Sequence, residues 1–266
     1  MPKTVMDYVR DHYAEAREHF PEDRIVGIFL QGSQNYNLQV PGSDVDTKLI
    51  VVPTFDDIVF NRKAVSTTHV RQNNEHIDFK DIRLYTETFR NQNLNFLEIL
   101  FTRYCILNPL YEEEWMRLVE AREFIAHMNL YRAVKSMKGI AMEKYHAMEH
   151  PYPSKLDILA QYGYDPKQLH HLVRVDNFQD QFIAGVPYEK CLVPEGEFHN
   201  HLMDIKMGQY DLTEARIMAE DTLAHAVQTS DLFCAENPAY EDKWCRTLLE
   251  DVTANIMKIA VQEELK

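Results

Sequence analysis

Cysteine and glycine are both scarce in this sequence, and their scarcity excludes several kinds of site. The four cysteines form no CxxC pair and are too few for a disulfide framework in 266 residues. The eight glycines form neither a Walker loop nor a dinucleotide-binding loop. No Ser/His/Asp or Cys/His arrangement points to a nucleophilic hydrolase. We therefore expect reduced, mostly buried thiols at Cys105, Cys191, Cys234 and Cys245.

Long apolar runs and an excess of positive charge are also missing. No run approaches the roughly 20 apolar residues that a membrane helix needs, and residues 1–20 lack the features of a signal peptide. We therefore expect a cytoplasmic protein with no membrane partner. The formal net charge of −14 repels polyanions, so broad binding of DNA or RNA is not expected. Two small basic clusters are either ordinary surface charge or contacts for a triphosphate or an RNA end: Arg62-Lys63, and Lys167 with Arg174.

The hydrophobic pattern predicts a mixed region of strands and helices followed by a helical region. Helical spacing marks residues 4–19 and 54–61, and short apolar or alternating runs predict strands at residues 24–31, 45–52, 64–71 and 75–82. The last two strands form a hairpin around a polar turn. Beyond Tyr85 helices are predicted near residues 86–101, 111–124, 126–148, 154–162, 166–184, 197–207, 212–229 and 240–265. This order predicts an α+β fold with domains at 1–110 and 111–266.

One group of residues in the predicted region of strands and helices is typical of a catalytic site. Gly32-Ser33 ends the first predicted strand, and after ten further residues the sequence continues with Asp44-Val45-Asp46. Residues two apart on a strand point to the same face, so the two carboxylates are presented together. A third acid, Asp78, lies between two apolar residues on a neighbouring predicted strand. We expect all three acids to share one site.

Three clustered carboxylates repel one another unless a cation lies among them. Oxygen ligands of this kind suit Mg²⁺ or Mn²⁺, and two such ions assist in-line displacement at phosphorus. Gly32 lets the backbone approach a phosphate closely, and Ser33 adds a hydroxyl and an amide donor. These parts predict two metal ions bound by Asp44, Asp46 and Asp78, and a nucleoside triphosphate, such as ATP, attacked at its α-phosphate by a hydroxyl.

The stretch LQGSQNYNLQVPGSDVDTKLIVVP resembles the GS-x-DxD signature of the nucleotidyltransferase superfamily that contains DNA polymerase beta. It is similar, more closely, to bacterial and phage-type predicted nucleotidyltransferases, one branch of which is associated with RNA repair. The likeness continues at 95–100, at 163–174 and at 205–208. It implies a polymerase beta-like sheet domain whose helical partner closes over the nucleotide. It also implies nucleotide or acceptor contacts at Lys48, Lys167, His171 and Arg174.

The sequence departs from this family at three positions near the signature. Gln34 and Asn37 stand where many relatives have arginine and glycine, and Lys48 stands where arginine is common. The catalytic acids are unaffected, but the contacts to the phosphates differ. Tyr36, in the same loop, either stacks on a base or is an exposed loop tyrosine.

These observations together predict a metal-dependent nucleotidyltransferase that moves a nucleoside monophosphate to a hydroxyl and releases pyrophosphate. An RNA 3′ end, a small molecule and a protein side chain are all chemically compatible acceptors. Two alternatives remain open. One is a metal-dependent phosphohydrolase that uses the same acids to activate water, and the other is a catalytically silent nucleotide-sensing module.

Overall fold

The computed structural model describes residues 3–266, which divide into two compact units. Unit 1 contains the described residues up to Met128 together with Glu241–Lys266, and unit 2 contains Asn129–Tyr240. The chain leaves unit 1 after Met128, and returns to it beside the same point, where the Asp242 amide donates to the Met128 carbonyl at 2.8 Å. The predicted boundary between residues 110 and 111 is therefore wrong, because the last helix belongs with the sheet.

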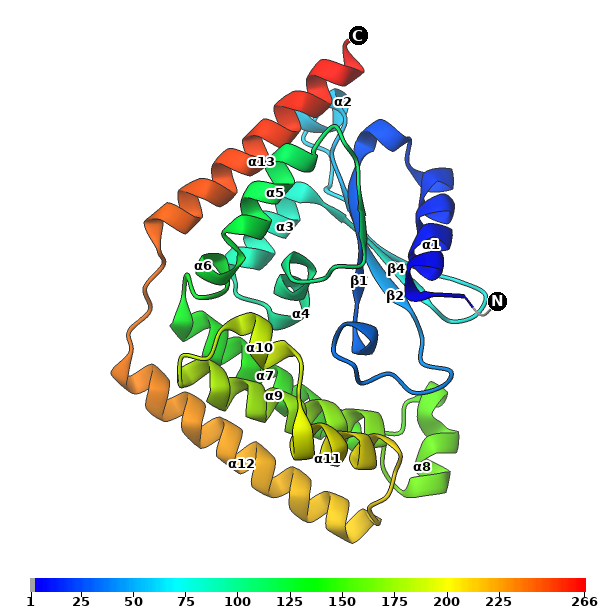
Figure 1. The fold of residues 1–266 in the computed structure, drawn as a ribbon, viewed down its shortest axis with the longest axis vertical. Coiled ribbons are helices and arrows are strands. Elements are labelled where there is room, and N and C mark those ends of the chain that lie inside the picture. The colour runs from blue at the N-terminus through cyan, green and yellow to red at the C-terminus, as the bar shows by residue number, and fades with distance from the viewer. Residues whose placement is uncertain (1–2) are drawn as a thin grey trace. The chain divides into compact units, whose positions relative to one another are not determined.

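Unit 1 is built on one mixed sheet of five strands in the order β3-β4-β2-β1-β5 (Figure 1). β1 is antiparallel to both β2 and β5, β2 is parallel to β4, and β3 is antiparallel to β4. The predicted α+β class with a mixed sheet is confirmed. The strands are β1 Ile25–Gln31, β2 Asp46–Val51, β3 Ser66–Val70, β4 His76–Asp81 and β5 Cys105–Leu107.

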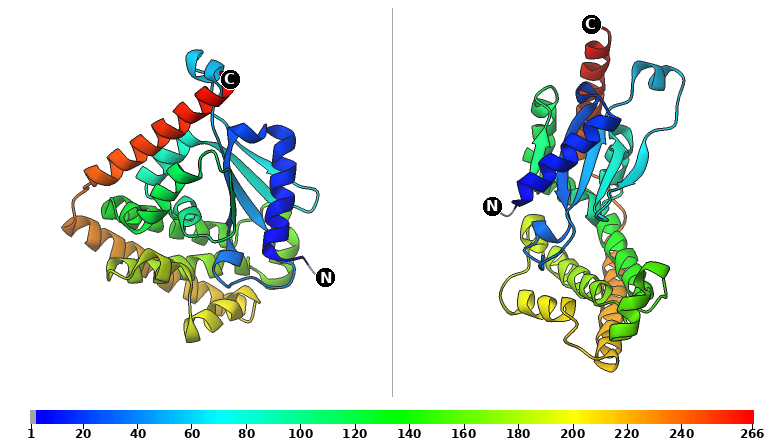
Figure 2. Two further views of the ribbon diagram at one scale, coloured as in Figure 1. Left: turned by 45° about the horizontal axis from the view of Figure 1, so that its top comes forward. Right: turned by 90° about the vertical axis from the view of Figure 1, so that its right-hand side faces the viewer.

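The two faces of this sheet differ because strand side chains alternate. Helix α1 (Val5–His19) begins with a capping box at Thr4 and covers one face (Figures 1 and 2). Its Val9 and Ala16 join the core that contains Ile28, Leu49 and other strand residues. On the opposite face, Phe29 contacts Trp115 of α5 (Glu112–Glu120), with ring centroids 4.8 Å apart. The same opposite face carries the polar residues of β2 and β4.

The last helix, α13 (Lys243–Glu264), packs against α3 and α5 in unit 1. It buries Leu249, Val252 and Ile256 along one side. Ion pairs join it to the same unit: Arg117 to Asp251 at 2.6 Å, for example. The other helices of unit 1 are α2 Phe55–Val59, α3 Ile82–Arg90, α4 Leu94–Leu97 and α6 Arg122–Ala126, with 3₁₀ turns at Glu22–Arg24, Ser33–Asn35 and Glu98–Leu100.

Unit 2 is helical throughout its regular elements. Its central pair is α7 (Leu130–Met148) and α9 (Pro166–Ile183), and the long α12 (Leu212–Glu236) packs against both (Figure 2). α11 (Gly196–Lys206) also packs on α9. The remaining elements are a 3₁₀ turn at Pro153–Lys155, α8 Leu156–Tyr162 and α10 Tyr188–Leu192.

Most of the predicted elements are confirmed, and the differences have local causes. The predicted helix at 86–101 is broken after Arg90, where Gln92 takes a φ of 53° and its side chain donates to the carbonyls of Phe89 and Ile125. The short β5 and α10 were not predicted, because three to five residues give no measurable period. Within residues 3–266, no helix combines the length and the apolar character needed to cross a membrane.

Candidate active site

The turn after β1 has the geometry that its glycine permits. Gly32 has φ 85° and ψ −158°, a conformation that residues with a Cβ rarely adopt. Ser33 then begins a 3₁₀ turn, and its carbonyl accepts from the amides of Tyr36 and Leu38 at 3.1 Å. Asn37 has φ 58°, so the position where many relatives have glycine keeps a left-handed backbone, which asparagine tolerates better than most residues. Asparagine at position 37 is therefore compatible with the shape of this turn.

Asp44 and Asp46 lie on either side of the start of β2. A turn at Pro41-Gly42 precedes Asp44 and is closed by the Ser43 amide, which donates to the Val40 carbonyl at 2.9 Å. Asp44 follows this turn and is exposed. Asp46 is the first residue of β2 and pairs with Gln31, which places it beside the turn at Gly32. The turn at Gly32 and the first residue of β2, Asp46, are therefore neighbours.

Asp78 lies on the same face of the sheet as Asp46. In the parallel pairing of β2 and β4, Asp78 is opposite Lys48, two residues beyond Asp46. We call this set the polar face: Asp46, Lys48, His76 and Asp78. The Lys48 Nζ lies 3.3 Å from Asp78 Oδ2, and the Thr68 hydroxyl donates to Oδ1 at 2.6 Å. Asp78 is thus held by two groups of its own unit.

Lys48 is a buried cation, with 4% of its side chain exposed. Burial lowers the pKa of its ammonium group, although the Asp78 carboxylate favours the charged form. Its Nζ also lies 4.2 Å from the centre of the Phe96 ring, where a cation is attracted to the face of the aromatic system. Lys48, for which a nucleotide contact was predicted, therefore forms an ion pair with Asp78. Its contact with a nucleotide stays a prediction.

The carboxylates of the polar face fit a divalent cation in their chemistry, and partly in their geometry. Their side chains remain 28% exposed at Asp46 and 30% exposed at Asp78. Asp46 Oδ1 accepts from the amide and from Nδ1 of His76, at 2.9 and 3.2 Å, whereas its Oδ2 has no hydrogen bond to residues 3–266. Among residues 3–266, however, Asp44, Asp46 and Asp78 do not form a group whose ligand atoms all lie within 4.8 Å of one another. An ion at Asp78 would have to compete with Lys48 for its carboxylate.

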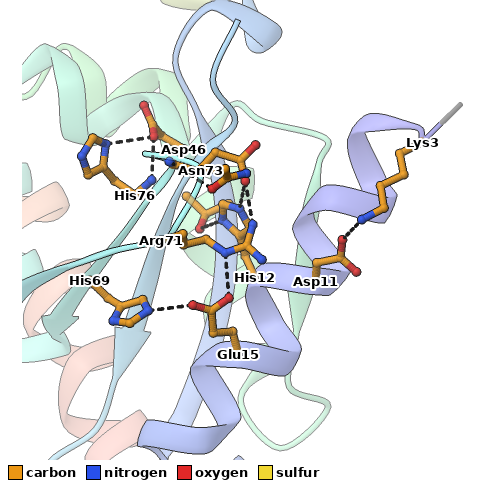
Figure 3. A network of polar contacts seen from close by, with 11 residues as sticks. Lys3, Asp11, His12, Glu15, Asp46, His69, Arg71, Asn73 and His76 are labelled. Carbon is orange, nitrogen blue, oxygen red and sulfur yellow. Dashed lines mark hydrogen bonds and ion pairs between the residues drawn. The ribbon is translucent and has the colours of Figure 1, made fainter. Parts of the chain in front are cut away.

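A buried polar network supports Asp46 from the other face of the sheet (Figure 3). His12 of α1 is fully buried and hydrogen-bonds Thr47, next to Asp46, at 2.9 Å and Glu75, next to His76, at 3.0 Å. Arg71 donates to Glu75 at 2.6 Å and to Glu15 at 2.7 Å. Burial lowers the pKa of His12, so the ring is held neutral. This network fixes the two strand ends that carry Asp46 and His76.

The sequence did not reveal the partners of these acids. The sequence pattern did not single out His76 and His12 as site residues. Their contacts depend on the register between β2 and β4 and on the packing of α1 against the sheet. Tyr36 is 4% exposed, so the expectation of an exposed loop tyrosine is wrong. Stacking of its ring on a base stays a prediction.

The remaining predicted contacts lie in unit 2, on α9. Lys167 is exposed, His171 is half-buried and Arg174 is buried. Burial and the neighbouring Arg174 hold the pKa of His171 well below its usual value. The predicted site residues thus form two sets, one in each unit, and nucleotide contacts at the second set stay a prediction.

A further group of possible ligands also lies in unit 2. Asp176 and Asp180 of α9 and His225 of α12 present ligand atoms within 4.8 Å of one another. His225 Nδ1 lies 2.9 Å from Asp176, whose hydrogen bond raises the pKa of the imidazole. The spacing of the two aspartates on one helix was the only signal in the sequence. An ion pair between α9 and α12 accounts for the arrangement.

Comparison with known proteins adds little to this geometry. No family model matches the chain, and no curated protein matches it. A solved structure described as a nucleotidyltransferase-like protein from Exiguobacterium sibiricum 255-15 aligns over 98% of this chain and 92% of that chain, at 9% identity. Its TM-score of 0.30 is too low to transfer fold or function. Any function proposed for this chain depends on the chain's own residues.

Proposed function

We propose that this protein transfers a nucleoside monophosphate from a nucleoside triphosphate to a hydroxyl acceptor and depends on a divalent cation, Mg²⁺ or Mn²⁺. One observation carries the proposal. The pairing of Gln31 with Asp46 and of Lys48 with Asp78 brings a glycine turn and carboxylates to one end and one face of the sheet. Phosphoryl transfer needs little covalent chemistry from a protein, so positioning of this kind supplies most of the catalysis.

In this proposal Asp44 and Asp46 hold the cation and Asp78 completes the site. The bound cation would neutralise charge on the α-phosphate and orient the acceptor oxygen. The acceptor oxygen bonds to the α-phosphorus, the bond from that phosphorus to the bridging oxygen breaks, and pyrophosphate leaves. Asp78 takes the proton of the acceptor hydroxyl, with Lys48 and Thr68 holding its carboxylate in place.

The turn at Gly32 and Ser33 binds the β and γ phosphates in this proposal. The positive φ of Gly32 turns the backbone at the end of β1, and no neighbouring atom lies within 4 Å of the position of an added Cβ. The space beside the turn is therefore open on the side that a side chain would occupy. Backbone amides in such a turn are suitable donors for phosphate oxygens.

One observation favours a second candidate, a nucleotide-binding module without turnover. Lys48 already neutralises Asp78, so the polar face has a positive charge where a second ion is expected. A site of this kind can hold a nucleotide while lacking the charge that drives transfer. The two functions differ in their products and are separated by one experiment.

The experiment measures pyrophosphate release and transfer of α-phosphate label by the full chain. Each NTP is supplied in turn with Mg²⁺ or Mn²⁺ and a mixed pool of RNA and metabolites. Asp44→Asn and Asp46→Asn are the test variants. Asp11→Asn is the matched control, because Asp11 lies on α1, partly exposed and paired with Lys3.

Label transfer that is lost in both test variants and kept in Asp11→Asn establishes the transferase. Binding of NTP without transfer to any acceptor, including the protein itself, rejects it in favour of the silent module. Release of orthophosphate alone rejects it in favour of a phosphohydrolase.

A further inference from the structure

Lys80 adds a second lysine to the side of the sheet that carries the polar face. The side chains of a strand alternate between its two faces, so Lys80 points to the same side of β4 as Asp78. In the register of β2 and β4, Lys80 is opposite Ile50, whereas Asp78 is opposite Lys48. The candidate catalytic acids therefore share their side of the sheet with two lysines.

These two lysines share an aromatic ring and differ in their carboxylate partners. The Nζ atoms of Lys48 and Lys80 lie 4.2 and 4.0 Å from the centre of the Phe96 ring. Lys48 also pairs with Asp78 at 3.3 Å. The ammonium group of Lys80 is half-buried and forms no ion pair or hydrogen bond with residues 3–266. Lys80 is thus a cation held against a ring, with all its N–H donors unused in the described part of the chain.

The hydroxyl of Tyr85 is a second donor without an acceptor in the same place. Tyr85 lies on α3 and is fully buried, and its ring meets the edge of Phe96 with centroids 5.7 Å apart. The Lys80 Nζ lies 6.0 Å from the centre of the Tyr85 ring. The Tyr85 hydroxyl has no hydrogen-bond partner among the described residues. A buried donor without an acceptor is unfavourable and rare, so it needs an explanation beyond packing.

Two neighbouring donors without an acceptor favour a ligand that brings oxygen acceptors and negative charge. Lys80 offers three N–H groups and Tyr85 offers one O–H group. A phosphate group has three strong acceptor oxygens, and its charge strengthens the hydrogen bonds that they accept. A phosphate therefore satisfies both donors at once.

The position of Lys80 along the sheet decides which substrate carries this phosphate. The turn at Gly32, where we place the β and γ phosphates, lies beside Asp46 at the start of β2. Asp78 follows along the sheet, and Lys80 lies two residues, or about 7 Å, beyond Asp78 on β4. Lys80 is therefore farther from the turn than Asp78, on the side of the acceptor hydroxyl.

We propose that Lys80, with the hydroxyl of Tyr85 as a second donor, binds a phosphate group of the acceptor. The acceptor is then a phosphorylated hydroxyl compound, such as a nucleotide or a sugar phosphate. Its phosphate lies about 7 Å from the oxygen that reacts at Asp78. This inference rests on the proposed nucleotidyl transfer and adds the chemical class of its acceptor. Lys80 and Tyr85 neither gain nor lose a proton or group in the transfer, because their part is to position the acceptor.

The test compares two acceptors that differ only in a phosphate, adenosine and adenosine 5′-monophosphate. Transfer of α-phosphate label from an NTP to each acceptor is measured with the full chain and Mg²⁺. The wild type is expected to have a kcat/KM about tenfold higher for the monophosphate, because one charge-assisted hydrogen bond is added. Lys80→Met is expected to raise KM for the monophosphate about tenfold and to leave the KM values for adenosine and the NTP unchanged.

Three further variants separate charge, hydroxyl and fold. Lys80→Arg keeps the charge and is expected to recover most of the affinity for the monophosphate. Tyr85→Phe keeps the ring and should raise the same KM about threefold, because a hydrogen bond from a neutral donor is weaker. Lys258→Met is the matched control, since Lys258 is exposed on α13, and it is expected to behave like the wild type.

Two kinetic results overturn the proposal. One is equal use of adenosine and its monophosphate by a wild type whose KM values are unchanged in Lys80→Met. The other is a raised KM for the NTP in Lys80→Met with both acceptors unaffected, which assigns Lys80 to the donor triphosphate instead.

Chemical protection of Lys80 separates this proposal from the proposed function, because it needs no turnover. Reductive methylation of the wild type, read by mass spectrometry, reports the reactivity of Lys80 with either compound present. Protection by adenosine 5′-monophosphate and not by adenosine supports the phosphate site, and if no acceptor is labelled the transferase fails alone. Absence of protection by the monophosphate overturns the phosphate site, even where label transfer to another hydroxyl establishes the transferase.

Discussion

The polar face of the sheet and the start of α9, where His170 lies, differ in whether their polar side chains have hydrogen-bond partners. On the polar face, Lys48 pairs with Asp78 and the amide of His76 donates to Asp46, so both carboxylates have a nearby partner. At the start of α9, His170 is buried and its ring has no hydrogen bond. The difference teaches that hydrogen-bonded charges fix the geometry of the sheet, whereas the buried ring of His170 is fixed by packing without a hydrogen bond.

The largest effect is expected at the ion pair of the polar face. Replacing Lys48 by Met leaves Asp78 without its cation and should lower the free energy of unfolding by about 2 kcal/mol, since removing one partner of a buried pair is strongly destabilising and Asp78 keeps some solvent. Urea denaturation measures this change. Lys80→Met is the control, because Lys80 lies over the same Phe96 ring at 4.0 Å. Equal losses in the two variants would show that the ring contact matters and the ion pair does not.

The pH dependence of stability tests the neutral state of His170. Burial and the neighbouring Arg174 lower its pKa to about 3 in the folded protein, whereas the unfolded chain has the ordinary value of about 6.5, so the unfolded chain binds one more proton between these values. The wild type therefore keeps its full free energy of unfolding above pH 6.5 and loses part of it as the pH falls below that value. In His170→Leu the free energy of unfolding should fall by about 1.4 kcal/mol less per pH unit than in the wild type. Denaturant titrations at a series of pH values measure both slopes.

His225 provides a control of opposite sign for that experiment. The Asp176 hydrogen bond raises the pKa of His225, so this group adds stability below its unfolded pKa and loses it as the pH rises. The deficit of His225→Leu relative to the wild type should therefore grow as the pH falls. The same direction of change in both histidine variants would contradict the assignment of a neutral His170.

The sequence resemblance implies nucleotide contacts at Lys167 and Arg174 of α9, and the affinity of these residues for triphosphate is expected to fall at alkaline pH. Burial lowers the pKa of Lys206, near these two residues, to about 8, so Lys206 loses its proton above that value. Affinity should fall by at most about tenfold per pH unit above pH 8, because binding then requires Lys206 to take up one proton. Calorimetry across this range checks the slope. An identical slope in Lys206→Gln would reject Lys206 as its source.

The smallest effect is expected at the turn of Gly32. Gly32→Ala should destabilise the protein by about 1 kcal/mol, because φ 85° with ψ −158° is unfavourable for alanine even where space is open. Gly139→Ala, inside α7 with no atom within 4 Å of the new Cβ, should stabilise by about 1 kcal/mol instead. Thermal unfolding compares the two. A stabilised Gly32→Ala would show that the turn has no need of a glycine.

Much of the fold was predictable because local patterns determine it. The predicted helices at residues 166–184 and 212–229 begin as expected, because Asp165 and Asp211 cap α9 and α12 with their side chains. The hairpin of β3 and β4 followed from its polar turn, where Asn74 has φ 65°. The domain boundary was wrong because the docking of α13 on unit 1 depends on contacts such as that between Arg117 and Asp251, 134 residues apart.

The types of residue in the candidate site were predictable from the sequence, but the contacts between their side chains were not. The two-residue spacing of Asp44 and Asp46 gave a shared face, and the apolar neighbours of Asp78 placed it on a strand. The contact between Lys48 and Asp78 required the parallel register of β2 and β4. Register between strands far apart in the chain is set by the packing of the whole sheet, which periodicity does not reveal.

The sequence by itself determined most element types and the turn at Gly32, because these follow from periodicity and glycine over a few residues. Only the tertiary structure decided that Asp78 is held by Lys48, that unit 2 is an insertion between Met128 and Glu241, and that His170 lies buried without a hydrogen bond. Burial and pairing depend on which surfaces exclude water, and that is settled by contacts between distant segments of the chain.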